Sequence, residues 1–178
     1  MKLFKLTLVM ILSVAMLTGC GGGGSSNPAA STVDVLADYP TIAASYNTMQ
    51  TNMLDNTGDT TVRVNAFMAH VSNEFKNIAG AAKFNDLRTV TLSRLDRYSF
   101  NSYSMTPISH TVVDDNTVNV VTTILVNVAL KPGEAGNAPE NTDIYLENIS
   151  ITWKNEAGTW RLYQGLPYTS DEYWGLSD

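Results

Sequence analysis

The chain has 178 residues with 17 acidic and 11 basic side chains, so its formal net charge is −6 at pH 7. This negative charge repels the phosphate backbone of nucleic acid, which we therefore exclude as a partner, and it argues against an electrostatic hold on anionic lipids. The only cysteine, Cys20, leaves no intramolecular disulfide, so the fold depends on packing. The length after the N-terminal region fits one ordinary domain.

The N-terminus has the pattern of a secretory signal. Lys2 and Lys5 precede an apolar run over 6–17, which is shorter than the roughly 20 apolar residues of a membrane-spanning helix. Residues 17–20, Leu-Thr-Gly-Cys, resemble the lipobox of bacterial lipoprotein precursors. The resemblance implies cleavage before Cys20 and acylation of that cysteine, and two or more acyl chains hold a protein stably on a membrane. The alternative is an ordinary signal peptide that is cut a little later.

These features predict three segments of the chain. They are a lipoprotein signal peptide over 1–19, a lipidated Cys20 with a flexible Gly/Ser tether over 20–32, and a single domain over 33–178. Gly21 stands where an Asp would resemble the inner-membrane retention signal. We therefore expect a lipid-anchored protein of the cell envelope, on the outer membrane and facing the periplasm.

The first part of the domain shows helical spacing. Over 35–53, apolar and aromatic residues recur at steps of three and four, and Pro40 suits a first helical turn. A second stripe follows the capping residue Asp59 and ends at Gly80, which predicts a second helix over 59–80. The members of this stripe are Val64, Phe67, Val71, Phe75 and Ile78. Over 85–98 the pattern fits both a helix and a strand, and we favour a third short helix.

The second part of the domain predicts β-structure. Four segments over 98–113, 118–130, 142–153 and 159–166 are separated by a turn at 114–117, a loop over 131–141 and a turn at 155–158. Over 118–130, apolar residues alternate with Asn119, Thr123 and Asn127, which is typical of a half-buried antiparallel sheet. Helices followed by strands predict an α+β domain, with N-terminal helices packed on a curved antiparallel sheet of about four to five strands.

The closing sequence ITWKNEAGTWRLYQGLPY adds a family resemblance. Together with the order of the elements, it is similar to the NTF2-like superfamily, whose cone of helices and sheet has a similar Trp, acidic-Gly turn and Trp-Arg-Leu ending. The residues that carry the resemblance are Trp153, Gly158, Trp160, Arg161 and Leu162, and it covers roughly 35–168. The resemblance implies the fold. It includes no catalytic signature, and because one fold supports many functions, it does not imply an activity.

Glu147 is the one candidate catalytic carboxylate. NTF2-like enzymes place a general base in the mouth of the cone, often beside a Tyr or His. If the strand is regular, Glu147 shares an otherwise apolar inner face with Tyr145 and Trp153. If a bulge lies near Glu147 and Asn148, Ile144 points inward instead and Glu147 faces solvent. Both alternatives remain open from the sequence, which shows no convincing catalytic constellation.

The two histidines do not predict a metal site. His70 lies four residues before Glu74 on the predicted second helix, a spacing that gives a surface pair, and His110 lies in a β segment. No third ligand with suitable spacing accompanies them, so we expect neither a metal nor a cofactor.

The aromatic residues of the β segments are candidates for binding an apolar ligand in the cone. They are Tyr98, Tyr103, Tyr145, Trp153 and Trp160, with Phe100 and Tyr163 beside them in the sequence pattern. The alternative is that these residues only pack the core and the half-exposed sheet. Tyr173 and Trp174, beyond the last strand, could dock on the domain or face a partner.

Three functions therefore remain for the domain. The first, which we favour, is an envelope lipoprotein that is not an enzyme and that binds a small apolar ligand or a protein partner. The second is an enzyme of the isomerase or dehydratase kind that uses Glu147 or a nearby Tyr. The third is a structural or assembly subunit that forms a homodimer through its open sheet face.

Overall fold

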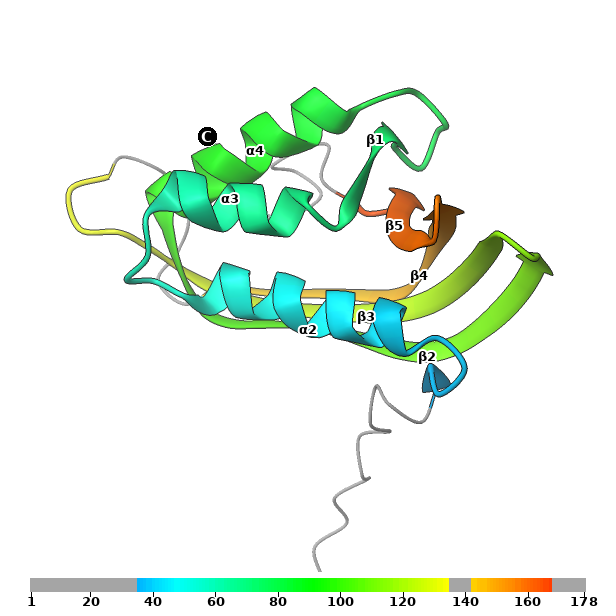
Figure 1. Cartoon of the computed structure of the whole chain (residues 1–178). Helices are drawn as coiled ribbons and strands as arrows, with labels where there is room; N and C mark the ends of the chain where they lie inside the picture. The colour runs from blue at the N-terminus through cyan, green and yellow to red at the C-terminus, as the bar shows by residue number, and fades with distance from the viewer. Residues whose placement is uncertain (1–34, 135–141, 168–178) are drawn as a thin grey trace, which may run out of the picture.

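The computed structural model describes residues 35–134 and 142–167, which form helices packed on a curved sheet. The elements are α2 (Pro40–Leu54), α3 (Thr60–Met68), β1 (Val71–Lys76), α4 (Phe84–Arg97), β2 (Tyr98–Asp114), β3 (Thr117–Leu130), β4 (Thr142–Glu156) and β5 (Thr159–Gln164). Figure 1 shows β2, β3 and β4 as long ribbons that curve along the three helices. The expected α+β architecture is confirmed.

The five strands form one mixed sheet in the order β1-β5-β4-β3-β2. The pairs β2–β3, β3–β4 and β4–β5 are antiparallel, as expected, whereas β1 and β5 are parallel. Val71 lies opposite Leu162, and the Leu162 amide donates a hydrogen bond of 2.9 Å to the His70 carbonyl. The four strands expected from the sequence are therefore antiparallel to one another, and β1 adds a parallel edge that the sequence did not predict.

Two of the helices begin where the sequence signals predict. Pro40 occupies the first turn of α2, where its missing amide hydrogen costs nothing. The Asp59 side chain caps α3 by accepting a 3.0 Å hydrogen bond from the Val62 amide. The segment that suited either a helix or a strand is the helix α4, as favoured from the sequence.

The second predicted helix is shorter than expected. α3 ends at Met68, and Val71 and Phe75, expected on the same helix, are buried residues of β1. Residues four apart share a face in a strand as well as in a helix, so their spacing does not distinguish the two. The parallel partner β5 decides for the strand, because it supplies hydrogen bonds that a continued helix would not make.

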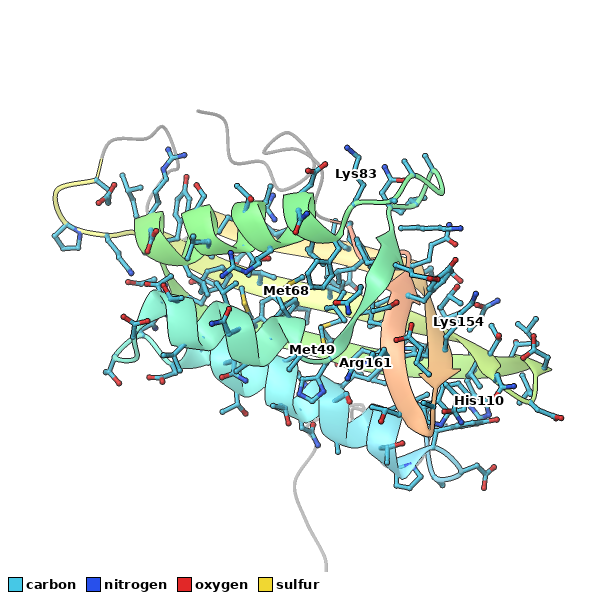
Figure 2. All side chains as sticks on the ribbon, turned by 45° about the horizontal axis from the view of Figure 1, so that its top comes forward. Met49, Met68, Lys83, His110, Lys154 and Arg161 are labelled. Carbon is cyan, nitrogen blue, oxygen red and sulfur yellow. The ribbon has the colours of Figure 1, made fainter. Side chains whose placement is uncertain are left out.

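The core lies between the helices and the inner face of the sheet. Along β3, alternate side chains from Val118 to Val128 are buried. Figure 2 shows Met49 of α2 and Met68 of α3 in the space between the helices and the sheet. No helix of the described residues is long and apolar enough to cross a membrane. Cys20, the predicted tether, Tyr173 and Trp174 lie outside the described residues.

Candidate functional site

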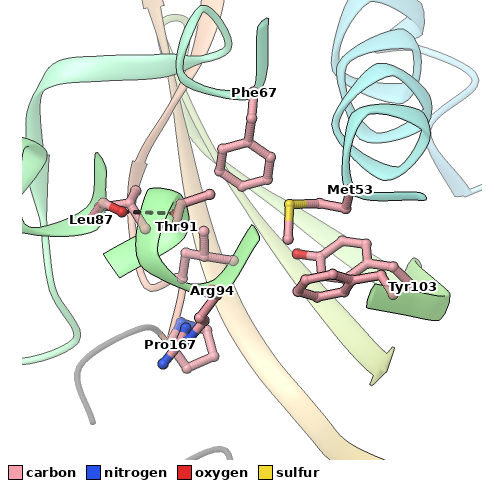
Figure 3. A pocket seen from close by; sticks show the side chains of 9 residues that line it. Met53, Phe67, Leu87, Thr91, Arg94, Tyr103 and Pro167 are labelled. Atoms are coloured by element: carbon pink, nitrogen blue, oxygen red, sulfur yellow. Dashed lines mark hydrogen bonds between the residues drawn. The ribbon is translucent and has the colours of Figure 1, made fainter. Parts of the chain in front are cut away.

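A small cavity lies inside the cone, between the ends of α2 and β5 and the facing sides of α3, α4 and β2 (Figure 3). About 20 Å³ is open to the centre of a water-sized sphere, which is room for about one water molecule. Its lining is mainly apolar and consists of Met53, Phe67, Leu87, Thr91, Arg94, Phe100, Tyr103, Leu166 and Pro167. The cone is therefore nearly filled by its own side chains.

Two polar side chains give the cavity its chemistry. Arg94 is only 6% exposed, and Tyr103 is 5% exposed. Burial raises the pKa of the Tyr103 hydroxyl above its ordinary value, although the nearby Arg94 guanidinium opposes that shift. Tyr103 is therefore a neutral phenol, and its hydroxyl end points into the space that the lining residues enclose (Figure 3). Arg94 brings a permanent positive charge to the lining.

The helix α4 positions one side of this cavity. Leu87, Thr91 and Arg94 lie four and three residues apart, so they share the face of α4 that turns inward. The Thr91 hydroxyl donates a hydrogen bond of 2.8 Å to the Leu87 carbonyl, so its hydrogen is used within the helix. Arg94 is therefore the charged group that α4 contributes to the lining.

A bulge in β2 positions the other side. The register of β2 against β3 shifts between Phe100 and Ser102, which leaves Asn101 as an extra residue. Phe100 and Tyr103 consequently both point inward, although they are three residues apart. Their rings lie 6.0 Å apart in an edge-on arrangement. The bulge thus places a phenol and a phenyl ring beside each other in the lining.

The structure brings one of the five predicted ligand-binding aromatics, Tyr103, to this cavity. Tyr98 is buried, with the Arg97 guanidinium 5.5 Å from the centre of its ring. Trp153 is completely buried, and its indole N–H donates to the Tyr46 hydroxyl at 3.3 Å. Both side chains pack away from the cavity lining.

The other two predicted aromatics lie elsewhere. Trp160 is half-buried at the start of β5, where Tyr39 contacts it edge-on with ring centres 5.5 Å apart. Tyr145 is 57% exposed on the face of β4 that points away from the helices. The cone pocket expected from all five aromatics is therefore not a single site.

Glu147 lies at a β-bulge and faces solvent. Thr122 pairs with Ile149 and Ile124 with Leu146, so two residues of β4, Glu147 and Asn148, oppose one residue of β3. Asn148 has a φ of 55°, in the left-handed region. The Tyr145 hydroxyl donates to Glu147 on the same exposed side, and this hydrogen bond raises the pKa of Tyr145. The sequence allowed either a regular strand with Glu147 inside or a bulge with Glu147 in solvent, and the structure shows the bulge.

The histidines do not lie where the sequence suggested. His70 was expected on a helix with Glu74, but it falls between α3 and β1, and Glu74 is on the strand. Its Nδ1 lies 2.9 Å from the Ser45 hydroxyl. His110, on β2, has its Nδ1 2.8 Å from the Val35 carbonyl oxygen. Within 35–134 and 142–167, no three His, Cys, Asp or Glu side chains gather as a metal site would require.

Sequence reasoning missed Arg94 as a functional candidate. The signal was present, because Arg94 lies on the same helical stripe as Leu87 and Thr91, next to the buried Leu95. A charged residue on an apolar stripe is usually explained by a long side chain that reaches solvent. Here the side chain stays buried, which only the packing of β2 and residues 166–167 against α4 reveals.

Comparison with known proteins supports the architecture. No family model and no curated protein matches the sequence. A conserved protein from Planctomyces limnophilus DSM 3776 is similar in structure, with a TM-score of 0.53 and 12% identity over 72% of this chain and 92% of that chain. The two proteins share a fold of helices packed on a curved sheet.

Two further solved structures are similar to this domain. A ketosteroid isomerase-like protein from Erwinia carotovora atroseptica SCRI1043 is 12% identical, with a TM-score of 0.49, over 71% of this chain and 92% of that chain. An NTF2-like protein from Rhodospirillum rubrum ATCC 11170 is 13% identical, with a TM-score of 0.44, over 73% and 93%. NTF2-like proteins include isomerases, dehydratases and binding proteins, so the fold alone does not decide the function.

Proposed function

We propose that the protein is a lipid-anchored envelope protein whose cone cavity binds a small ligand with an apolar body and one anionic group. The observation that carries this proposal is the buried Arg94 in an otherwise mainly apolar lining. A buried guanidinium forms its strongest contacts with a carboxylate or phosphate, because these anions accept two parallel hydrogen bonds. Tyr103 supplies a further hydroxyl on the opposite wall.

A binding role is favoured over a catalytic one by the residues in the interior. Buried polar and charged side chains among the described residues are Ser45, Arg63, Ser72, Thr91, Arg94 and Thr122. An isomerase or dehydratase of this fold needs a general base within hydrogen-bond reach of its substrate. The described lining of the cavity offers no carboxylate or imidazole for that step, and Glu147 faces the other side of the sheet.

Ligand entry requires the lining to move, because the cavity accepts about one water molecule. Leu166 and Pro167 follow β5 and belong to no helix or strand, so they are the part of the lining with the fewest backbone constraints. Met53 adds a flexible side chain that can adopt several packed conformations. We expect these three residues to rearrange when a ligand enters.

The test compares two probes that differ in charge. Benzoate and benzamide share an aromatic body, and benzoate alone carries a carboxylate. We expect saturation-transfer NMR on the full-length protein in detergent to show benzoate binding at least tenfold more tightly than benzamide. Arg94→Met should abolish this preference, and Arg94→Lys should retain part of it.

The control variant is Arg88→Met. Arg88 lies on the same helix, is half-exposed and hydrogen-bonds Asn65 at 3.2 Å, so it does not line the cavity. It should leave the preference for benzoate unchanged. Equal binding of the two probes, or a preference that survives in Arg94→Met, would overturn the proposed ligand class.

The membrane anchor in this proposal rests on the sequence of residues 17–20. Cells grown with radiolabelled palmitate should incorporate label into the protein and lose it in Cys20→Ser. The labelled protein should remain with the membrane fraction unless detergent is added, because several acyl chains give stable anchoring. Unlabelled protein released into the medium would contradict the anchor without affecting the cavity.

An assembly role is a second candidate, supported by the outer face of the sheet. We define this face as the side chains of β2, β3 and β4 that point away from the helices. Three of its cross-strand rows are Ser104–Leu125–Tyr145, Ser109–Val121–Ser150 and Thr111–Asn119–Thr152. These three rows contain no charged side chain, and Leu125 is 43% exposed. A second copy could pack on them if it also pairs Glu147, the carboxylate beside Tyr145 on the same face.

The mass of the protein in solution tests this second candidate. Sedimentation equilibrium should give a dimer for the wild type and a monomer for Leu125→Glu. Val62→Glu is the matched control, because Val62 is 65% exposed on α3, away from the outer face. A wild-type monomer would reject the assembly role.

A further inference from the structure

A second cleft, separate from the cone cavity, opens between α2 and the start of β5. Its volume is about 280 Å³, close to the lower end of the roughly 300–1,000 Å³ range of small-molecule sites. α2 contributes Thr41, Ala44 and Thr48, and the opposite side is formed by His70, Thr159 and Trp160. The described lining residues include hydroxyls, an imidazole and an indole, and none carries a carboxylate, ammonium or guanidinium group.

His70 presents an acceptor to this cleft. The Ser45 hydroxyl donates its single hydrogen to the Thr41 carbonyl at 2.9 Å, so it can only accept from His70. His70 Nδ1 therefore carries a hydrogen and donates it to Ser45 across 2.9 Å. In the neutral ring this leaves the lone pair on Nε2. Burial and the nearby Arg161 guanidinium lower the pKa of His70, so the neutral ring is the form present near pH 7.

Trp160 supplies an indole wall and backbone groups at the edge of the sheet. Tyr39 contacts the indole edge-on at 89°, which holds the ring in place. β1 begins at Val71 opposite Leu162, and the Leu162 amide points toward β1. Alternate residues of a strand direct their amide and carbonyl groups to the same side, so those of Trp160 point the same way. They lie before the first residue of β1, at the edge of the cleft.

We propose that this cleft binds one uncharged saccharide unit. A pyranose has an aliphatic ring face that packs on an indole and a rim of hydroxyls that both donate and accept. One sugar hydroxyl donates to His70 Nε2, and others meet the Trp160 backbone and the hydroxyls of Thr41, Thr48 and Thr159. An anionic or cationic ligand would find no opposite charge among the described lining residues.

The experiment uses the full-length protein in a detergent that has no sugar headgroup. Saturation-transfer NMR is recorded with glucose, galactose and N-acetylglucosamine, and with glycerol as a hydroxylated molecule without a ring. We expect at least one pyranose to receive saturation, with glycerol at least fivefold weaker. His70→Asn should reduce the pyranose signal at least fivefold, because Asn can donate to Ser45 but offers no acceptor at the position of Nε2. Ala44→Leu should reduce it similarly by filling the cleft.

Matched controls separate the cleft from general effects of mutation. His110→Asn alters the other histidine that hydrogen-bonds a neighbour through Nδ1, and Thr51→Leu places the same Leu side chain on an exposed part of α2 outside the cleft. Both should retain the wild-type signal, and thermal unfolding followed by circular dichroism checks that all four variants fold. No saturation of any of the three sugars, a glycerol signal as strong as theirs, or a signal that survives Ala44→Leu would overturn the proposal. Because ligand binding in the cone cavity is tested with benzoate and binding in the cleft with sugars, either proposal can be rejected without the other.

Discussion

The hydroxyls of Tyr46 on α2 and Thr122 on β3 lie 2.8 Å apart in the core, and the Trp153 indole N–H reaches the same Tyr46 oxygen at 3.3 Å. All three side chains are completely buried. This small polar network ties the helix to the middle of the sheet. Burial raises the pKa of Tyr46 to about 12, so the phenol stays protonated throughout the physiological range.

Removing the Tyr46 hydroxyl should destabilise the protein. Tyr46→Phe leaves the Thr122 hydroxyl and the Trp153 N–H without this partner in the core, at a cost of about 1–3 kcal/mol. Thr122→Val in the same background should cost less than the sum of the two single changes, because the orphaned hydroxyl is then absent. Urea unfolding of the three variants measures this. Additive costs would show that the two hydroxyls are not coupled.

Gly165 should not tolerate a side chain. Its φ is 99°, and a Cβ there would lie 2.0 Å from the Ser150 carbonyl oxygen. Gly80 has a similar φ of 85° but no atom within 4 Å of an added Cβ, so Gly80→Ala costs only the conformational penalty of about 1–2 kcal/mol. Gly165→Ala should lower the free energy of unfolding by at least twice as much, or prevent folding. Similar urea midpoints for the two variants would contradict this.

The bulge in β4 depends on the residue that adopts its left-handed conformation. Asn148→Val should cost about 1–2 kcal/mol, because a β-branched side chain is disfavoured at a φ of 55°. Asn148→Gly should be within about 0.5 kcal/mol of the wild type. Ser150→Val, an exposed site two residues along the same strand, should not destabilise the protein. The prediction fails if Val is tolerated equally at both positions, as chemical denaturation would show.

Acid should destabilise the protein in part through His70. Its pKa is lower in the folded protein than the ordinary value of 6.5, because of burial and Arg161. The unfolded chain therefore binds the proton more readily, and the stability that the neutral ring contributes above pH 6.5 is lost as the pH falls below that value. Unfolding measured from pH 7.5 downward should show a shallower decline for His70→Asn. Identical slopes for the wild type and His70→Asn would exclude this role.

Most of the fold was predictable because its signals are local. Alternation along β3, the Pro and Asp at helix starts and the short turn before β5 all depend on neighbouring residues. β1 was missed because Val71 and Phe75 suit a helical stripe equally well, and the choice is made by a distant strand. The parallel edge of the sheet therefore could not be derived from local spacing.

The sites were less predictable than the fold. Tyr103 was among the candidates for the cavity, but the aromatic pattern did not show that a bulge would aim it beside Arg94. The position of Glu147 depended on whether β4 carries an extra residue. A regular strand and a strand with a bulge both fit the alternation of apolar residues in the sequence. The pair formed by His70 and Ser45 joins two elements that only the tertiary structure brings together.

The pairing of β1 with β5 also determines when the sheet can finish folding. β1 lies among the helices, yet within the described residues it pairs in the sheet with β5, the last of the described strands. During synthesis, β1 therefore has no partner strand until β5 has been made. A truncation before Thr159 should therefore leave the earlier half unfinished as well as removing the end.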